Sequence, residues 1–251
     1  MTNEYIKAVA LKQSAIDLGC QPEDLTRNKS LAVISKADPT ARKYLGLPFF
    51  LDLTSYSSNI VASCSPEIID FAQKFIDRED FYHCFEPDLL YELNSELGKY
   101  GMRVKYMADY YLPEPELVEA ALRLNTCPYE LKTLTQSDFS ELYLPEWSNA
   151  LCESRRELDV LGVGAYDSGR LVGLAGCSAD CDEMWQIGVD VLPEYRRLGV
   201  AKTIVTNLAA LIMEKGKVPF YCAAWSNVKS RKCAVASGFR PGWVEITAKP
   251  F

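Results

Sequence analysis

The chain has 251 residues, of which 27 are basic and 34 acidic, so its net charge is −7. This acidic balance disfavours non-specific binding to nucleic acid or anionic membranes and is compatible with a cationic, amine-bearing substrate. Since no apolar run approaches the roughly 20 residues that span a bilayer and the N-terminus does not resemble a signal peptide, we expect no membrane association and a cytoplasmic location.

The reactive residue types exclude several chemistries. The chain has nine cysteines, an odd number whose spacings suggest no disulfide framework, and one histidine, His83. A zinc site needs about four ligands, and no second ligand pair stands near His83 and Cys84. We therefore expect no bound metal. No nucleophile-elbow pattern accompanies the histidine, which disfavours triad chemistry.

Residues 1–112 are predicted to form a smaller N-terminal mixed α/β domain. The apolar patterns and first-turn prolines predict helices at 5–18, 66–76 and 87–97, and strands at 31–35, 49–53, 59–64 and 103–111.

A linker helix is predicted at residues 113–126. Two prolines between Leu112 and Glu116 stop regular structure, and the apolar spacing that follows is helical. The helix is expected to end at Asn125–Pro128.

Residues 127–251 have a clearer order of elements. Strands are predicted at 129–134, 158–166, 170–177, 184–191, 220–224 and 243–247, and helices at 136–143, 200–215 and 227–237. Asp167-Ser168-Gly169 indicates a tight hairpin. This order predicts a mixed sheet with helices on both faces.

The stretch from Val191 to Ala201 joins a predicted strand to a predicted helix. A helix N-terminus offers unpaired N–H groups and a partial positive charge, which favour a phosphate or pyrophosphate. Gly199 lets an anion approach the backbone closely, and Arg196 and Arg197 add positive charge. The Gly-Lys-Ser/Thr ending of a Walker A loop is absent, and a single glycine excludes a dinucleotide fingerprint.

Two motifs in this half of the chain resemble the GNAT superfamily of N-acetyltransferases. The cofactor-loop signature Gln/Arg-x-x-Gly-x-Gly/Ala is matched by Arg196, Gly199 and Ala201. The family's last conserved helix and turn are resembled by Asn227, Ser230, Ala234, Gly238 and Phe239. The resemblance covers about half the chain and implies a C-terminal GNAT fold, a mixed and mostly antiparallel sheet flanked by helices.

The resemblance implies that acetyl-CoA binds as co-substrate. Backbone groups near Val189 and Val191 would contact the pantetheine amides between two splayed strands, and Asn227 and Ser230 would contact the pantetheine arm from the other side. The pyrophosphate would lie on a loop whose cofactor-binding residues are Arg196, Arg197, Leu198, Gly199, Val200 and Ala201. A backbone N–H near Val191 would polarise the thioester carbonyl.

The proton-transfer residues depart from the family pattern. Many members place a tyrosine seven residues after the asparagine, where this chain has Ala234, so a water, another tyrosine or no acid at all remain open. Glu183, two residues before the usual position of a carboxylate, is the candidate general base or a solvated charge at the strand entry. Tyr221 and Trp225 are candidates for the acceptor pocket or for the core.

We therefore expect an N-acetyltransferase that moves an acetyl group to a primary amine of a small molecule or peptide by direct attack. The alternative is a catalytically weak or inactive acyl-CoA-binding sensor or partner-binding module. The N-terminal domain would cover the acceptor site, brace the sheet or be a degenerate second copy of the fold. A homodimer is left open.

Overall fold

The computed structural model describes residues 1–78, 80–124 and 127–251 and divides into two compact units. Unit 1 comprises Met1–Val9 and Tyr111–Pro241, and unit 2 comprises Ala10–Tyr110 and Gly242–Phe251.

Three elements contribute to both units: helix α1 (Asn3–Leu18) and strands β4 (Met102–Pro113) and β10 (Phe239–Pro250). The predicted boundary at residue 112 lies close to the division after Tyr110. Residues 242–251, assigned from sequence to the C-terminal domain, lie instead in unit 2, because β10 pairs there with β2 (Leu51–Ser55) in antiparallel register.

The predicted linker helix is α4 (Pro115–Arg123), and it is an integral part of unit 1. Val118 is buried in the same core as α5, and the Glu114 N–H donates a 2.9 Å hydrogen bond to the Gly238 carbonyl. Its predicted stop at Asn125–Thr126 lies outside the described residues.

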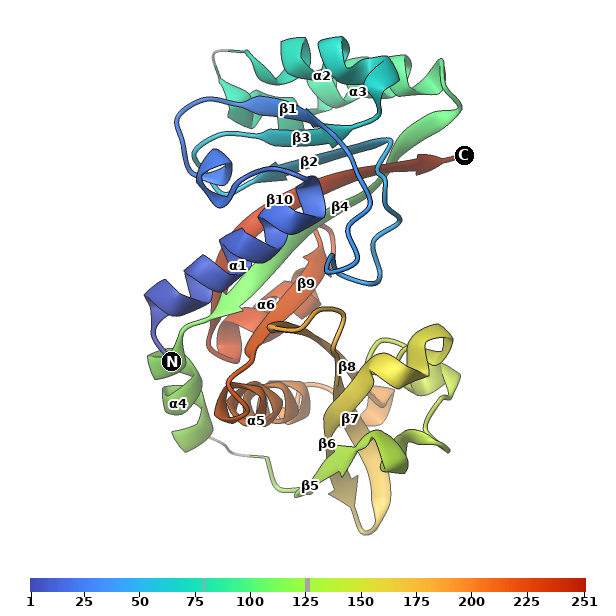
Figure 1. The fold of residues 1–251 in the computed structure, drawn as a ribbon. Helices are drawn as coiled ribbons and strands as arrows, with labels where there is room; N and C mark the ends of the chain where they lie inside the picture. The colour runs from blue at the N-terminus through green and yellow to red at the C-terminus, as the bar shows by residue number, and fades with distance from the viewer. Residues whose placement is uncertain (79, 125–126) are drawn as a thin grey trace. The chain divides into compact units, whose positions relative to one another are not determined.

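Unit 2 is built on strands in the order β1-β3-β2-β10-β4, with β1 and β3 parallel and β2 antiparallel to both β3 and β10. Helices α2 and α3 lie together on one side of these strands in Figure 1. The remaining elements are β1 (Leu31–Ile34), β3 (Val61–Cys64), α2 (Ile69–Ile76), α3 (Pro87–Gly98) and the 3-10 turns η1 (Pro22–Leu25), η2 (Pro66–Ile68) and η3 (Phe81–Phe85).

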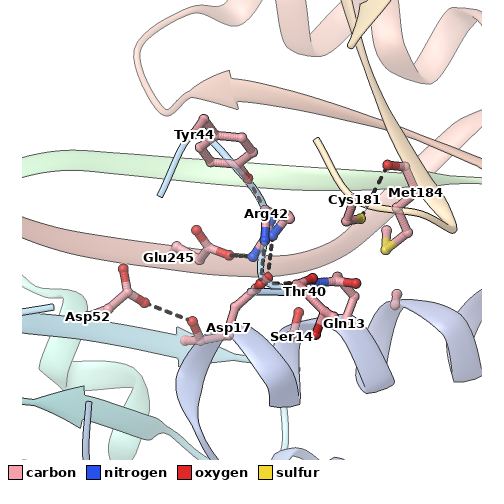
Figure 2. A network of polar contacts seen from close by, with 12 residues as sticks. Gln13, Ser14, Asp17, Thr40, Arg42, Tyr44, Asp52, Cys181, Met184 and Glu245 are labelled. Atoms are coloured by element: carbon pink, nitrogen blue, oxygen red, sulfur yellow. Dashed lines mark hydrogen bonds and ion pairs between the residues drawn. The ribbon is translucent and has the colours of Figure 1, made fainter. Parts of the chain in front are cut away.

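A buried ionic cluster centres on Arg42 in unit 2 (Figure 2). Its guanidinium contacts Asp17 and donates to Glu245 Oε1 at 3.0 Å. The rings of Tyr44, Tyr110 and Trp243 lie 5.5 to 5.6 Å from it, as in cation–π contacts.

Asp52 adds a third buried carboxylate to this cluster. It accepts from Thr54 at 3.0 Å and from Thr247 at 2.6 Å. Burial and the nearby Glu245 charge raise the pKa of Asp52 to about 7.

Unit 1 is built on strands in the order β4-β9-β8-β7-β6-β5. Neighbours from β5 to β8 are antiparallel, whereas β8 and β9 are parallel. Helix α5 lies against the sheet in Figure 1, and its apolar stripe forms the core with β6, β7 and β8. The elements are β5 (Glu130–Thr135), β6 (Asp159–Asp167), β7 (Arg170–Ser178), β8 (Met184–Val191), β9 (Val218–Ala224), α5 (Val200–Glu214) and α6 (Val228–Ala236). The predicted fold class, a mixed and mostly antiparallel sheet flanked by helices, is confirmed.

The helix predicted at 136–143 is wrong in length. The chain instead makes three 3-10 turns, η4 (Gln136–Phe139), η5 (Pro145–Trp147) and η6 (Glu153–Leu158). The backbone between η5 and η6 packs directly against β8 at Gly188. A Cβ at that position would lie only 1.8 Å from the Asn149 carbonyl oxygen, so only glycine leaves room for this contact. Within the described residues, no helix is long and apolar enough to cross a membrane.

Candidate functional site

Strands β8 and β9 are paired over only about half of their length, and beyond that point they diverge. Their parallel pairing runs from Met184 opposite Val218 to Ile187 opposite Tyr221. Beyond that pair, β8 continues to Val191 and β9 to Ala224, without further pairing between these described residues. The parting leaves backbone polar groups of β8 available to a ligand, since they are not used by a neighbouring strand.

Two residues of the loop after β8 have a left-handed backbone conformation, which shapes the loop. Arg197 has φ +67° and Gly199 has φ +79°. Left-handed backbone in a loop turns successive N–H groups toward a common concavity, which favours an anion. For a residue with a side chain, such as Arg197, this left-handed backbone conformation is strained. Backbone strain of this kind is concentrated at functional sites.

Helix α5 starts with its N–H groups uncapped. Its first hydrogen bond runs from the Thr203 N–H to the Gly199 carbonyl at 3.0 Å, and Gly199 supplies no side-chain cap. Over the described stretch 197–202, the backbone N–H groups have no protein acceptor. Residues 196–199 are exposed, so an anion can reach these groups.

Neighbouring elements hold the loop in place. The Arg196 Nε donates to the Val191 carbonyl at 2.9 Å, closing the loop onto the end of β8. The Tyr195 hydroxyl donates to Asp167 Oδ2 at 3.0 Å, in the β6–β7 hairpin, and this hydrogen bond raises the pKa of Tyr195. Arg170 on β7 pairs with Glu194 at 3.1 Å. These three contacts hold the exposed loop backbone in one conformation.

Asp190 fastens the segment that covers the other face of β8. Its carboxylate accepts from the Asn149 N–H at 2.8 Å, the Asn149 Nδ2 at 2.7 Å and the Ala150 N–H at 3.0 Å. Trp147 and Leu151 of this segment are buried in a small core with η4 and β7. Sequence reasoning did not find this contact, because the partners are about forty residues apart and share no motif.

Helix α6 approaches the parting strands from the side of α5. Asn227 caps it, its Oδ1 accepting from the Ser230 N–H at 3.1 Å. The Ser230 hydroxyl is 2.8 Å from the hydroxyl of Tyr221, the last paired residue of β9. The structure thus brings Asn227 and Ser230 beside the parting of β8 and β9.

Glu183 lies elsewhere on the strand. It is half-buried directly before β8, and its carbonyl accepts from the Val218 N–H at 2.8 Å. An extended strand places it about 26 Å from Val191, at the paired end of β8. Its role as a general base stays a prediction.

Comparison with known proteins agrees with this geometry. Residues 128–239 match the family model described as acetyltransferase (GNAT) family. No curated protein matches the chain.

Two solved structures show what the chain is similar to. A GCN5-related N-acetyltransferase from Kribbella flavida has 16% identity, with 98% of this chain and 95% of that chain covered and a TM-score of 0.51. A GCN5-related N-acetyltransferase-like protein from Streptococcus suis has 19% identity, 78% and 82% coverage and a TM-score of 0.47. The first establishes a shared fold and no more. Residues 128–239, in the C-terminal half of the chain, form a domain of the acetyltransferase (GNAT) family.

Proposed function

We propose that this protein transfers an acetyl group from acetyl-CoA to a primary amine of a small molecule or peptide. The observation that carries the proposal is the uncapped N-terminus of α5 beside the parted strands β8 and β9. The uncapped helix N-terminus suits a pyrophosphate. The diverging strands suit the pantetheine arm, whose amides need backbone hydrogen-bond partners.

The residues present fit this co-substrate. The N–H groups of residues 197–201 would hold the pyrophosphate, and the left-handed Gly199 keeps a side chain out of its way. Val189 and Val191 would offer backbone groups to the pantetheine amides. Asn227 and Ser230, at the start of α6, would contact the same arm from the opposite side.

The chemistry asked of the protein is positioning and stabilisation. A preorganised backbone N–H near Val191 would stabilise negative charge that develops on the thioester oxygen. The acceptor amine must lose a proton, and the net charge of −7 suits a cationic acceptor. Glu183 is the base that the sequence offers, but about 26 Å of extended strand separates it from Val191, which is too far for direct proton transfer there.

The loop assignment is tested by Gly199→Gln and its matched control, Gly216→Gln. Both glycines are left-handed, at φ +79° and +74°, so both variants carry the same backbone strain, about 1–2 kcal/mol. Gly216 follows the other end of α5 and a Cβ there meets no atom within 4 Å. Calorimetric titration with CoA should show at least about a tenfold loss for Gly199→Gln alone. Equal affinities in the two variants would place the pyrophosphate elsewhere.

Turnover is tested by following free thiol while the protein is incubated with acetyl-CoA and a panel of primary amines. Acetyl transfer releases CoA thiol in an amine-dependent manner. Tight CoA binding with no thiol release on any amine would instead support a sensor without turnover.

A further inference from the structure

The negative charge of the chain is concentrated in one short stretch. Residues 77–96 contain seven acidic residues and one basic residue, Arg78, and so carry six of the seven units of net negative charge. The described part of this stretch follows α2 in unit 2 and includes η3 and most of α3. A surface with this charge attracts positively charged partners and repels negatively charged ones.

Helix α3 presents an aromatic side chain to solvent within this stretch. Tyr91 is 77% exposed, the largest exposed fraction among the large hydrophobic side chains of the described residues. Leu93 and Leu97, on the other side of the helix, are buried in the core of unit 2. The exposed side consists of positions three or four residues apart, which lie on one face: Asp88, Tyr91, Glu92 and Ser95. We call Asp88, Tyr91 and Glu92 the α3 face.

The chain itself shows what this combination of groups binds. Arg78 donates to Glu92 at 2.6 Å, and its guanidinium lies 5.2 Å from the ring of Phe75. The guanidinium of the buried ionic cluster is likewise held by two carboxylates and three aromatic rings. A guanidinium suits both partners at once, because its plane stacks on a ring while its N–H groups donate to carboxylates. Tyr91 and Asp88 offer the same two kinds of partner at the surface.

We propose that the α3 face docks an arginine-rich segment of another protein. Arginine side chains of the partner would stack on the Tyr91 ring and donate to the carboxylates of Asp88 and Glu92. Charge complementarity selects this occupant, because a second copy meeting it through the same face would bring like charges together. The α3 face lies in unit 2, outside the matched residues 128–239, so the proposal goes beyond the proposed function and does not depend on it.

Fluorescence anisotropy with the whole chain tests this docking. The probe is a peptide of alternating arginine and serine residues, labelled at its N-terminus. It carries no primary amine, so it cannot bind as an acetyl acceptor. A peptide with glutamine in place of every arginine is the uncharged probe. Both probes are titrated at low salt and at physiological salt, where the Debye length is about 8 Å.

The variants remove the carboxylates and the ring separately. Asp88→Asn combined with Glu92→Gln neutralises the α3 face, and Glu116→Gln combined with Glu119→Gln on α4 is the matched control. Both pairs change the net charge equally, and each includes a glutamate that pairs with a surface arginine. Tyr91→Leu keeps an apolar side chain and removes the ring. All of these positions are exposed, so the variants should fold, which thermal unfolding verifies.

Wild type and the α4 control should bind the arginine probe equally well, and neither should bind the glutamine probe measurably. The neutralised α3 face should bind the arginine probe about tenfold more weakly, because two exposed ion pairs are lost. Tyr91→Leu should bind it about threefold more weakly, because a cation–π contact is lost. The first loss should shrink at higher salt, whereas the second should persist.

Several results would overturn the assignment. Equal losses in the α3 and α4 variants would show that net charge alone attracts the probe. Wild type that does not bind the arginine probe, or α3 variants that bind it as wild type does, would exclude the α3 face as its docking surface. A wild-type dimer in sedimentation that Tyr91→Leu abolishes would show that a second copy covers the face. Failure of CoA binding would remove the proposed function and leave these outcomes unchanged.

Discussion

The Tyr195 hydroxyl donates a hydrogen bond to Asp167 Oδ2 across 3.0 Å, joining the loop after β8 to the β6–β7 hairpin. The two residues are 28 positions apart, and a second hydrogen bond, from Arg196 Nε to the Val191 carbonyl, joins the same loop to the end of β8. These two hydrogen bonds therefore preorganise the loop backbone at which we propose that the pyrophosphate binds.

Removing this hydrogen bond should weaken CoA binding modestly. Tyr195→Phe keeps the ring that packs edge-on against Tyr129 but loses the hydroxyl. We expect CoA affinity to fall only about threefold, because the loop must then be ordered on binding but the lost contact is partly open to solvent. Calorimetric titration measures this change. Asp167→Asn, which keeps an acceptor oxygen, should fall less; a larger loss there than in Tyr195→Phe would show that the hydrogen bond is not the cause.

Replacing Arg197 by glycine should raise the stability of the protein and at the same time lower its affinity for CoA. Arg197→Gly removes a left-handed side chain at φ +67° and should raise the free energy of unfolding by about 1 kcal/mol. It also removes a cation from the loop at which we propose that the pyrophosphate binds, so CoA affinity should fall several-fold and depend less on salt. Urea denaturation and calorimetry at two salt concentrations measure the two effects.

Ser57→Gly is the matched control for Arg197→Gly, because Ser57 is also left-handed, at φ +74°, and belongs to unit 2. It should leave CoA affinity unchanged. If Arg197→Gly binds CoA as tightly as Ser57→Gly does, the Arg197 charge plays no part in binding.

Loss of the Asp190 carboxylate should destabilise unit 1. Asp190→Asn can accept with one oxygen but not with the amide nitrogen that replaces the other, so one of the three donors from Asn149 and Ala150 loses its acceptor. We expect unfolding to become easier by about 1–3 kcal/mol in urea denaturation. Asp182→Asn, at an exposed position before β8, should change stability by less than about 0.5 kcal/mol. Equal effects of the two changes would show that the hydrogen bonds from Asn149 and Ala150 to Asp190 do not stabilise unit 1.

Asp52, in the buried ionic cluster around Arg42, should make unit 2 less stable as pH rises. The folded pKa of Asp52 is about 7, raised from 3.8, so protonated Asp52 stabilises the fold at low pH. This contribution is present below about pH 4 and is lost as pH rises through about 7, an upper bound on the order of 4 kcal/mol. Hydrogen exchange of the β2 and β3 amides between about pH 5 and about pH 8 measures the loss, after correction for the intrinsic exchange rate.

In Asp52→Asn the pH dependence should flatten, because the titrating group is gone. Asp70→Asn, at an exposed position on α2, should keep the wild-type slope. A slope unchanged in Asp52→Asn would assign the effect to another group.

The sequence by itself determined most of the elements of unit 1 and drew attention to the loop between β8 and α5. The apolar stripe of α5 and the alternation along β6, β7 and β8 follow from the burial of one face, which local spacing records directly. Arg196, Gly199 and Ala201 could be singled out because they match the cofactor-loop signature of the GNAT superfamily, and their role in binding stays a prediction.

Only the tertiary structure decided which residues share a core and which distant side chains meet. The strand 243–247 was predicted, yet its membership of unit 2 depends on pairing with β2, nearly 200 residues earlier, which no local pattern encodes. In place of the helix expected at 136–143 the chain makes 3-10 turns, and the backbone that follows packs on Gly188, a long-range contact that local spacing does not encode. Tyr221 and Ser230 are nine residues apart on different elements, so their hydrogen bond appears only when β9 and α6 are brought together. Local spacing fixes periodicity, whereas long-range contacts depend on which faces the whole chain must bury.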